Sequence, residues 1–199
     1  SGNAITAVGS GTVTLDANGS ASDVAVNDGI QTVSGDITVT ADNNINFDAD
    51  GDVTSTSGNV SFTADAHDGG LASGALTMTD GALIDAGTGT ISLLADGDIT
   101  SAGLKTDNST NTAVTLTSRE GAIVDGGSAH LEVDAYAGRL VIDAATGAGH
   151  GNALEIKVAS TDITVSGTGN IDLDESDAIE LVDVDTADGS ITVVAGGTI

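Results

Sequence analysis

The segment Gly35-Asp36-Ile37-Thr38-Val39-Thr40-Ala41 contains the pattern that decides the fold. Its apolar residues alternate with polar residues at a period of two, which is the periodicity of a β-strand with one buried face. The frame of Gly, any residue, aliphatic, polar, apolar is found at seven places, beginning at Gly11, Gly35, Gly58, Gly89, Gly138, Gly169 and Gly189. Variants without the first glycine begin at Thr112 and Asn152. The sequence therefore predicts a series of similar short strands.

A second, shorter frame supplies further strands between the long ones. It consists of Gly, any residue and two residues suited to a strand, and it begins at Gly51, Gly81, Gly97 and Gly121. Successive long frames begin 24 residues apart at Gly11 and Gly35, 23 apart at Gly35 and Gly58, and 31 apart at Gly58 and Gly89. Such an irregular period is typical of a solenoid whose coils carry different loops. At about 22 residues per coil, residues 1–199 are expected to form one parallel β-solenoid segment of roughly nine irregular coils.

The composition favours a narrow core of small aliphatic side chains. Hydrophobic residues make up 39% of the chain, aromatic residues only 2%, and there is no Pro or Cys. β-Sandwich domains usually bury a large aromatic residue and carry Pro at their edges. No stretch shows the apolar spacing of an amphipathic helix, so we expect essentially no helix. One pattern keeps tandem β-sandwich modules open as an alternative, because the spacing I-x-x-x-A-x-G-x-I of residues 91–99 recurs at residues 191–199.

The charge of the chain excludes several classes of partner. Asp and Glu number 30 against 4 Lys and Arg, which gives a formal net charge of -26. Nucleic acid and anionic membrane surfaces would be repelled by such a chain. No apolar run reaches the roughly 18 residues that a membrane-spanning helix needs, so membrane insertion is not expected.

The repeated G-x-I-x-L-x-A frame followed by G-x-I-x-x is similar to the short degenerate repeats of filamentous haemagglutinin-like adhesins and other giant bacterial "beta strand repeat" surface proteins. This resemblance covers nearly the whole chain and rests on its low-complexity positions. It implies a right-handed parallel β-helix that is exported and displayed outside the cell as a long stalk or fibre. The amino-terminal secretion domain of that family has no counterpart in this sequence, and none of its receptor-binding residues can be carried over.

Asp48-Ala49-Asp50-Gly51-Asp52 is the first candidate metal site. Carboxylates at Asp48, Asp50 and Asp52, alternating around a turn, match the hard oxygen ligands that Ca²⁺ prefers and the beginning of a calcium loop. The match then fails, because Val53 occupies the position of the loop glycine and Asn59 that of the bidentate glutamate. An exposed acidic face with diffuse counterions therefore stays open as the alternative.

A second candidate metal site consists of Asp183, Asp185 and Asp188. In a strand, Asp183 and Asp185 project from the same face, which would bring two carboxylates together. Calcium is the candidate ion at both sites, and no other cofactor is indicated.

The function expected from these features is structural. We predict a segment of an extracellular bacterial fibre or adhesin stalk that supplies length, stiffness and an acidic hydrated surface. Both ends of the chain lie within repeat frames, so we expect the segment to belong to a longer array and to associate head to tail with further coils or copies. A host or neighbouring-cell surface is the expected attachment partner.

Two alternatives stay open for the function. One is a calcium-rigidified tandem β-sandwich adhesin. The other is a carbohydrate-active β-helix enzyme, which needs paired carboxylates. The chain has no G-x-S-x-G motif and few basic or aromatic residues for a sugar-binding groove, so catalysis is not expected.

Overall fold

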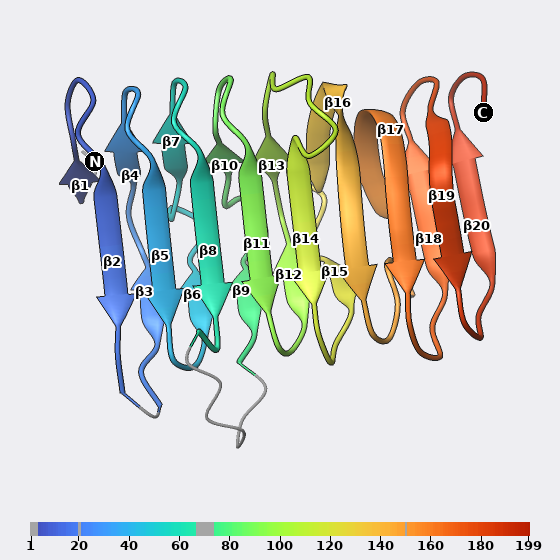
Figure 1. The fold of residues 1–199 in the computed structure, drawn as a ribbon, viewed down its shortest axis with the longest axis horizontal. Coiled ribbons are helices and arrows are strands. Elements are labelled where there is room, and N and C mark those ends of the chain that lie inside the picture. Colours follow the sequence, from blue (N-terminus) through green and yellow to red (C-terminus); the bar gives the residue numbers. More distant parts are fainter. Residues whose placement is uncertain (1–3, 20, 67–73, 150) are drawn as a thin grey trace.

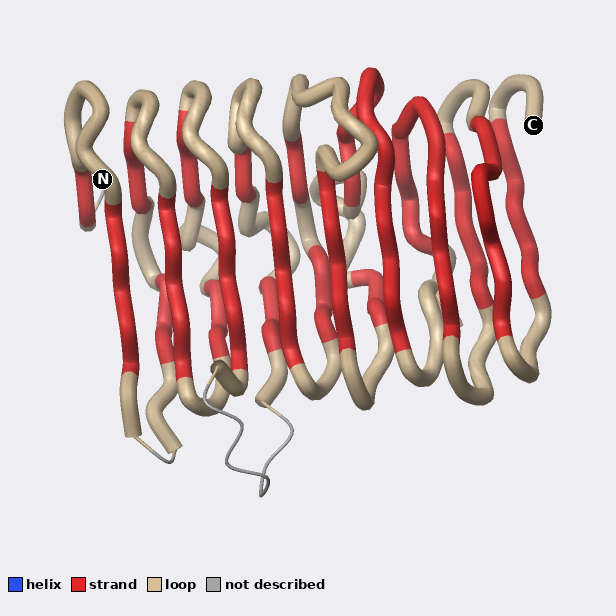
Figure 2. The backbone as a smooth tube through the Cα atoms, in the orientation of Figure 1, coloured by secondary structure: helices blue, strands red, loops and turns tan. Residues whose placement is uncertain are grey.

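The computed structural model describes residues 4–19, 21–66, 74–149 and 151–199, which form twenty β-strands and no helix. Figure 2 shows these strands as the successive sides of one continuous coil. Every pair of neighbouring strands is parallel, as in the pairing of β2 (Val13–Ala17) with β5 (Ile37–Ala41). The predicted all-β parallel solenoid without helix is confirmed. The tandem β-sandwich alternative was wrong, because sandwich modules are built from antiparallel sheets.

The coil has three faces, and its first face carries the longest regular strands. Besides β2 and β5, this face contains β8 (Val60–Ala64), β11 (Ile91–Ala95), β14 (Val114–Ser118), the second halves of β16 (Val133–Ala144) and β17 (Leu154–Val165), and β19 (Glu180–Thr186). The described chain therefore makes eight coils, close to the roughly nine predicted. Loops such as residues 106–113 lengthen some coils beyond 22 residues.

The second and third faces carry shorter strands. The second face contains β3 (Val24–Val26), β6 (Ile45–Phe47), β9 (Leu76–Met78), β12 (Ile99–Ser101) and β15 (Ile123–Asp125). Isolated bridges from Ile123 through Ala148 to Ile171 continue it to the beginning of β18 (Ile171–Glu175), whose Leu173–Glu175 pair with Leu154–Ile156 on the third face, and β20 (Ile191–Ala195) stacks on β18. The third face contains β1 (Ile5–Thr6), β4 (Ile30–Thr32), β7 (Val53–Ser55), β10 (Ile84–Asp85), β13 (Leu104–Lys105) and the first halves of β16 and β17.

The coil is right-handed. In Figure 1 the strands of the first face run downward in front, and the chain returns upward behind them while it advances from the blue amino-terminal end to the red carboxy-terminal end. This is the hand that strand twist favours for parallel crossover connections.

Stacked aliphatic ladders fill the interior. Ile37 lies opposite Val60 and Val60 opposite Ile91, and none of the three is more than 1% exposed. The intervening Thr38 and Ser61 point outward, as the period of two predicts. The inward ladder extends through Val114 and Leu140, so the alternating pattern correctly identified the core of this face.

Two of the long frames lie on a different face from the others. The frame that begins at Gly169 forms β18, and Ile171 continues the second-face ladder of Ile123 and Ala148. The frame that begins at Gly189 forms β20, in which Ile191 lies opposite Ile171. Ile191 is 45% exposed because β20 is the last strand of the stack.

The glycine of the frame is required by the close approach of neighbouring coils. A Cβ added to Gly58 would lie 2.0 Å from the carbonyl oxygen of Gly35, and a Cβ on Gly89 would lie 2.1 Å from that of Gly58. Real Cβ atoms do not approach backbone atoms so closely. At these coils the frame begins with glycine because a side chain there would collide with the backbone of the preceding coil.

Candidate metal centre

Three acidic side chains converge at the corner between the second and third faces. Asp125 ends β15, Glu132 directly precedes β16, and Glu155 lies in β17. Each offers a carboxylate oxygen, and these oxygens lie within 4.8 Å of one another. Val133 is in register with Ile156, so Glu132 and Glu155 lie beside each other on successive coils.

The loop that joins β15 to β16 brings Asp125 to the same corner. The backbone N–H of Gly127 donates to Oδ1 of Asp125 at 2.6 Å, and Gly127 has a φ of 144° that favours glycine. The Asn152 side-chain amide donates to the other oxygen, Oδ2 of Asp125. Both contacts hold the Asp125 carboxylate in place beside Glu132.

Glu132 is fully buried, and only one of its two carboxylate oxygens has a hydrogen-bond partner in the protein. Its exposed fraction is 0%, and its Oε2 accepts a hydrogen bond from the backbone N–H of Glu155 at 2.7 Å. Its Oε1 is buried without any hydrogen-bond partner among the described residues. A buried polar atom without a partner costs about 1–3 kcal/mol, and more when the group is charged. The buried Oε1 of Glu132 therefore lacks a partner that would offset this cost.

The electrostatics of the corner oppose a third negative charge. The pKa of Glu132 is raised from 4.5 to about 9, mainly by burial, with the hydrogen bond from Glu155 N–H opposing the rise and the negative charges of Asp125 and Glu155 adding to it. At neutral pH the Glu132 carboxyl group of the ion-free corner therefore holds a proton, which a bound cation would displace.

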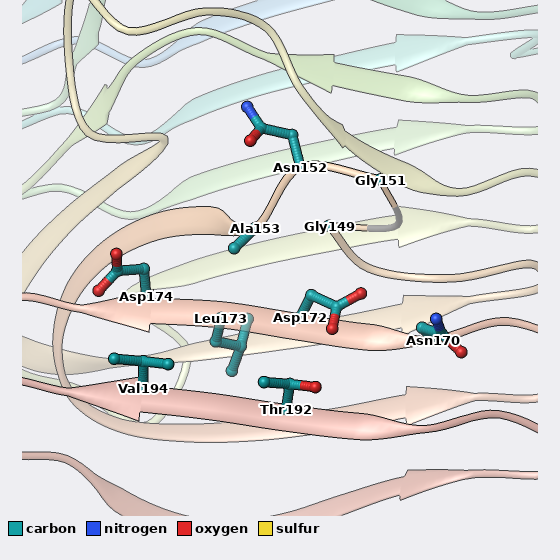
Figure 3. A pocket seen from close by; sticks show the side chains of 10 residues that line it. All are labelled: Gly149, Gly151, Asn152, Ala153, Asn170, Asp172, Leu173, Asp174, Thr192 and Val194. Atoms are coloured by element: carbon teal, nitrogen blue, oxygen red, sulfur yellow. The ribbon is translucent and has the colours of Figure 1, made fainter.

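A shallow hollow of about 470 Å³ lies next to this corner, on the surface between coils. Asn152 lines it, together with Asp172 and Asp174 of β18 and Thr192 and Val194 of β20. Figure 3 shows Asn152 above the strands and the four strand residues below it on two neighbouring strands. Asp172 lies opposite Thr192 and Asp174 opposite Val194, so the acidic side chains face solvent along one edge of the hollow. This lining favours cations over anions.

The predicted site at Asp48, Asp50 and Asp52 lies in the exposed turn between β6 and β7. Oδ1 of Asp48 accepts the N–H of Ala49 at 2.7 Å within the turn. Oδ1 of Asp52 accepts the N–H of Leu83 on the next coil at 3.1 Å. Within the described part of the chain, these three carboxylates do not form a group as closely convergent as Asp125, Glu132 and Glu155. Calcium binding at this turn stays a prediction.

The second predicted site, at Asp183, Asp185 and Asp188, is also exposed. Asp183 and Asp185 flank Val184, which packs against the core, so the two carboxylates project to the same side of β19. Oδ1 of Asp185 accepts the hydroxyl of Thr164 at 3.3 Å. These three residues likewise form no convergent group among the residues that the structure describes.

Several Asp and Asn residues have a structural role that the sequence reasoning missed. They occupy the second position of the frames, where their side-chain oxygen accepts a backbone N–H from the next coil. The pairs are Asp36 with Asn59, Asn59 with Thr90, Asp98 with Ala122, and Asn170 with Ser190. The signal was the repeated Gly-Asp or Gly-Asn at the beginning of a frame.

The carboxylate corner was missed because its residues are separated by 7 and 23 positions and share no motif: Asp125 and Glu132 lie outside the frames, and Glu155 lies in the variant frame that begins at Asn152. The one signal that could have indicated it is Glu132 itself, an acidic residue between Leu131 and the inward-facing Val133.

In the described part of the chain there is no helix long and apolar enough to cross a membrane.

No protein family matches the chain, and neither the curated proteins nor the solved structures show a significant match to it. The fold is that of a parallel β-solenoid, which is consistent with the resemblance to bacterial adhesin stalks at the level of architecture.

Proposed function

We propose that this chain is a structural segment of an extracellular bacterial fibre or adhesin stalk of the filamentous haemagglutinin-like kind. The observation that carries the proposal is the continuous set of inner ladders, which run from coil to coil through the length of the molecule. A stack of this kind gives length and stiffness, because each coil is held to both neighbours by parallel backbone hydrogen bonds.

The surface charge supports the same role. The net charge of -26 is balanced only locally, since Lys105, Arg119 and Arg139 each form an ion pair with an aspartate of a neighbouring coil. A strongly acidic rod is well hydrated and repels its neighbours laterally, which favours a single thin stalk over a bundle. We expect no catalytic activity from it.

The last coil supports association along the axis. Ile191 and Leu181 are 45% and 37% exposed there, although the residues that they stack on, Ile171 and Thr161, are buried. Further coils of the same array, or a second copy placed head to tail, would bury these side chains and satisfy the open strand edge.

Microscopy and sedimentation test this proposal. The native assembly should appear as thin unbranched fibres with strands perpendicular to the long axis and a layer spacing near 4.8 Å. The substitution Ile191→Asp should abolish concentration-dependent association of the chain, and the outward-facing Ser92→Asp should leave association unchanged. A chain that stays monomeric at high concentration, with both substitutions silent, would contradict the proposal.

A further inference from the structure

The carboxylate corner of Asp125, Glu132 and Glu155 has properties that an exposed acidic patch does not have. Their oxygens converge within 4.8 Å from the end of β15, the loop before β16, and β17 on the next coil. Glu132 contributes to this group from a fully buried position, with Oε1 unpartnered. Native structures seldom bury such an atom unless an ion, a water molecule or a functional requirement accounts for it.

The chemistry of the three carboxylates indicates which metal ions could bind at this corner. Carboxylate oxygens are hard ligands, and they suit Ca²⁺, Mg²⁺ or Mn²⁺ rather than the metals that prefer nitrogen and sulfur. Calcium–oxygen distances of about 2.3–2.6 Å let two ligands of one ion lie up to about 5 Å apart, whereas the shorter Mg²⁺ distances allow only about 4.2 Å. Oxygens that all lie within 4.8 Å of one another can therefore coordinate one Ca²⁺ ion together, and Ca²⁺ is the ion that we take as the ligand.

We propose that Asp125, Glu132 and Glu155 form a calcium-binding site that fastens successive coils of the solenoid together. The bound ion neutralises the three carboxylates and supplies the partner that Oε1 of Glu132 lacks. The predicted sites at Asp48, Asp50 and Asp52 and at Asp183, Asp185 and Asp188 are separate from it.

The position of the site shows what the ion would do. The second face is continuous up to β15, but beyond Asp125 it is carried only by isolated bridges at Ala148 until β18 begins. In the described part of the chain, Ala148 alone links the ladder of β15 to that of β18 at this point of the face. An ion held by Asp125, Glu132 and Glu155 would tie the end of β15 to β16 and β17 across this interruption.

Calcium titration of the chelator-treated chain tests the site, at neutral pH in 0.15 M NaCl so that diffuse counterion effects are screened. We expect one saturable Ca²⁺ per chain by calorimetry. At saturating Ca²⁺ the melting temperature should rise by about 5–10 °C. The same ionic strength supplied as NaCl should produce a clearly smaller rise.

Glu132→Gln is the decisive substitution, because it keeps the size and shape of the side chain but removes the carboxylate that would bind the ion. This variant should fold in chelator and lose the saturable Ca²⁺ binding. Glu175→Gln is the matched control. Glu175 is also a buried glutamate, but its Oε2 and Oε1 already accept the N–H groups of Val158 and Asp177, so its variant should keep the wild-type response.

Glu155→Gln provides an independent test if Glu132→Gln does not fold, since Glu155 is only half-buried. It should weaken Ca²⁺ binding at least tenfold. Absence of a saturable site in the wild-type chain would overturn the proposal. So would an unchanged Ca²⁺ response in the folded variants of Glu132 and Glu155, or a response lost instead on replacing Asp48.

Discussion

The substitution Gly58→Ala tests whether the frame glycine is required for coils to stack. The added methyl group would lie 2.0 Å from the carbonyl oxygen of Gly35 and 2.4 Å from its carbonyl carbon. Real Cβ atoms keep at least 3.0 Å from such atoms, so the two coils must separate locally by about 1 Å. Both contacted atoms belong to the backbone, and no side-chain rotation can relieve the clash.

The expected loss of stability can be worked out from the two hydrogen bonds beside the clash. Ile37 N–H donates to the Asn59 carbonyl at 2.9 Å, and Asn59 N–H donates to Oδ1 of Asp36 at 2.7 Å. A separation of about 1 Å takes both bonds beyond hydrogen-bonding distance, and each donor left without a partner costs about 1–3 kcal/mol. We therefore expect Gly58→Ala to lower the free energy of unfolding by about 2–6 kcal/mol, a large part of the stability of a typical domain.

Gly11→Ala is the matched control, because Gly11 begins the same frame on the first described full coil. The nearest atom to its added Cβ is the Val8 carbonyl oxygen at 3.2 Å, and the φ of Gly11 is not positive. Its small steric cost is offset by the lower entropy of the unfolded chain, so a change within about 1 kcal/mol is expected. Urea denaturation followed by far-UV circular dichroism measures both variants. Equal midpoints for the two would refute the stacking argument.

Three further perturbations test the core, the buried acid and the surface charge. Ile91→Asp places a charge between Val60 and Val114 at a position with 0% exposure and should prevent cooperative folding. The outward-facing Ser92→Asp should leave the thermal denaturation curve nearly unchanged. Similar effects of the two substitutions would show that the strand register is wrong. Burial raises the pKa of Glu175 above 4.5, so the folded chain keeps this proton when the unfolded chain has lost it, and stability falls as pH rises from 4.5 towards neutrality. Glu175→Gln should flatten this fall in denaturation curves taken across that range, and an unchanged slope would contradict it. Like charges about 5 Å apart on neighbouring coils repel by on the order of 1 kcal/mol per pair, so NaCl alone should raise the melting temperature measurably. Identical melting temperatures in low and high salt would show that repulsion between the carboxylates does not destabilise the solenoid.

The architecture was largely predictable because its determinants are local. Alternation such as that of Ile37, Thr38 and Val39 specifies a strand and its inward face, and repetition of the frame specifies that strands stack on copies of themselves. The absence of helix and the narrow aliphatic core follow from the same short-range pattern. Even the cross-coil hydrogen bonds of Asp36 and Asn59 have a local signature in the residue that follows the frame glycine.

The alignment of distant frames depended on the tertiary structure. The frames at Gly58 and Gly169 look equivalent in the sequence, yet one lies on the first face and the other runs from the second face onto the third. Loop lengths between frames decide which residue stacks on which, and loop length leaves no trace in the frame itself. The same physical reason hid the carboxylate corner. Asp125, Glu132 and Glu155 are unremarkable acids in the sequence, and they meet only because the loop after β15 and the register of β16 on β17 place them at one corner, where burial removes the solvent that would otherwise separate their charges.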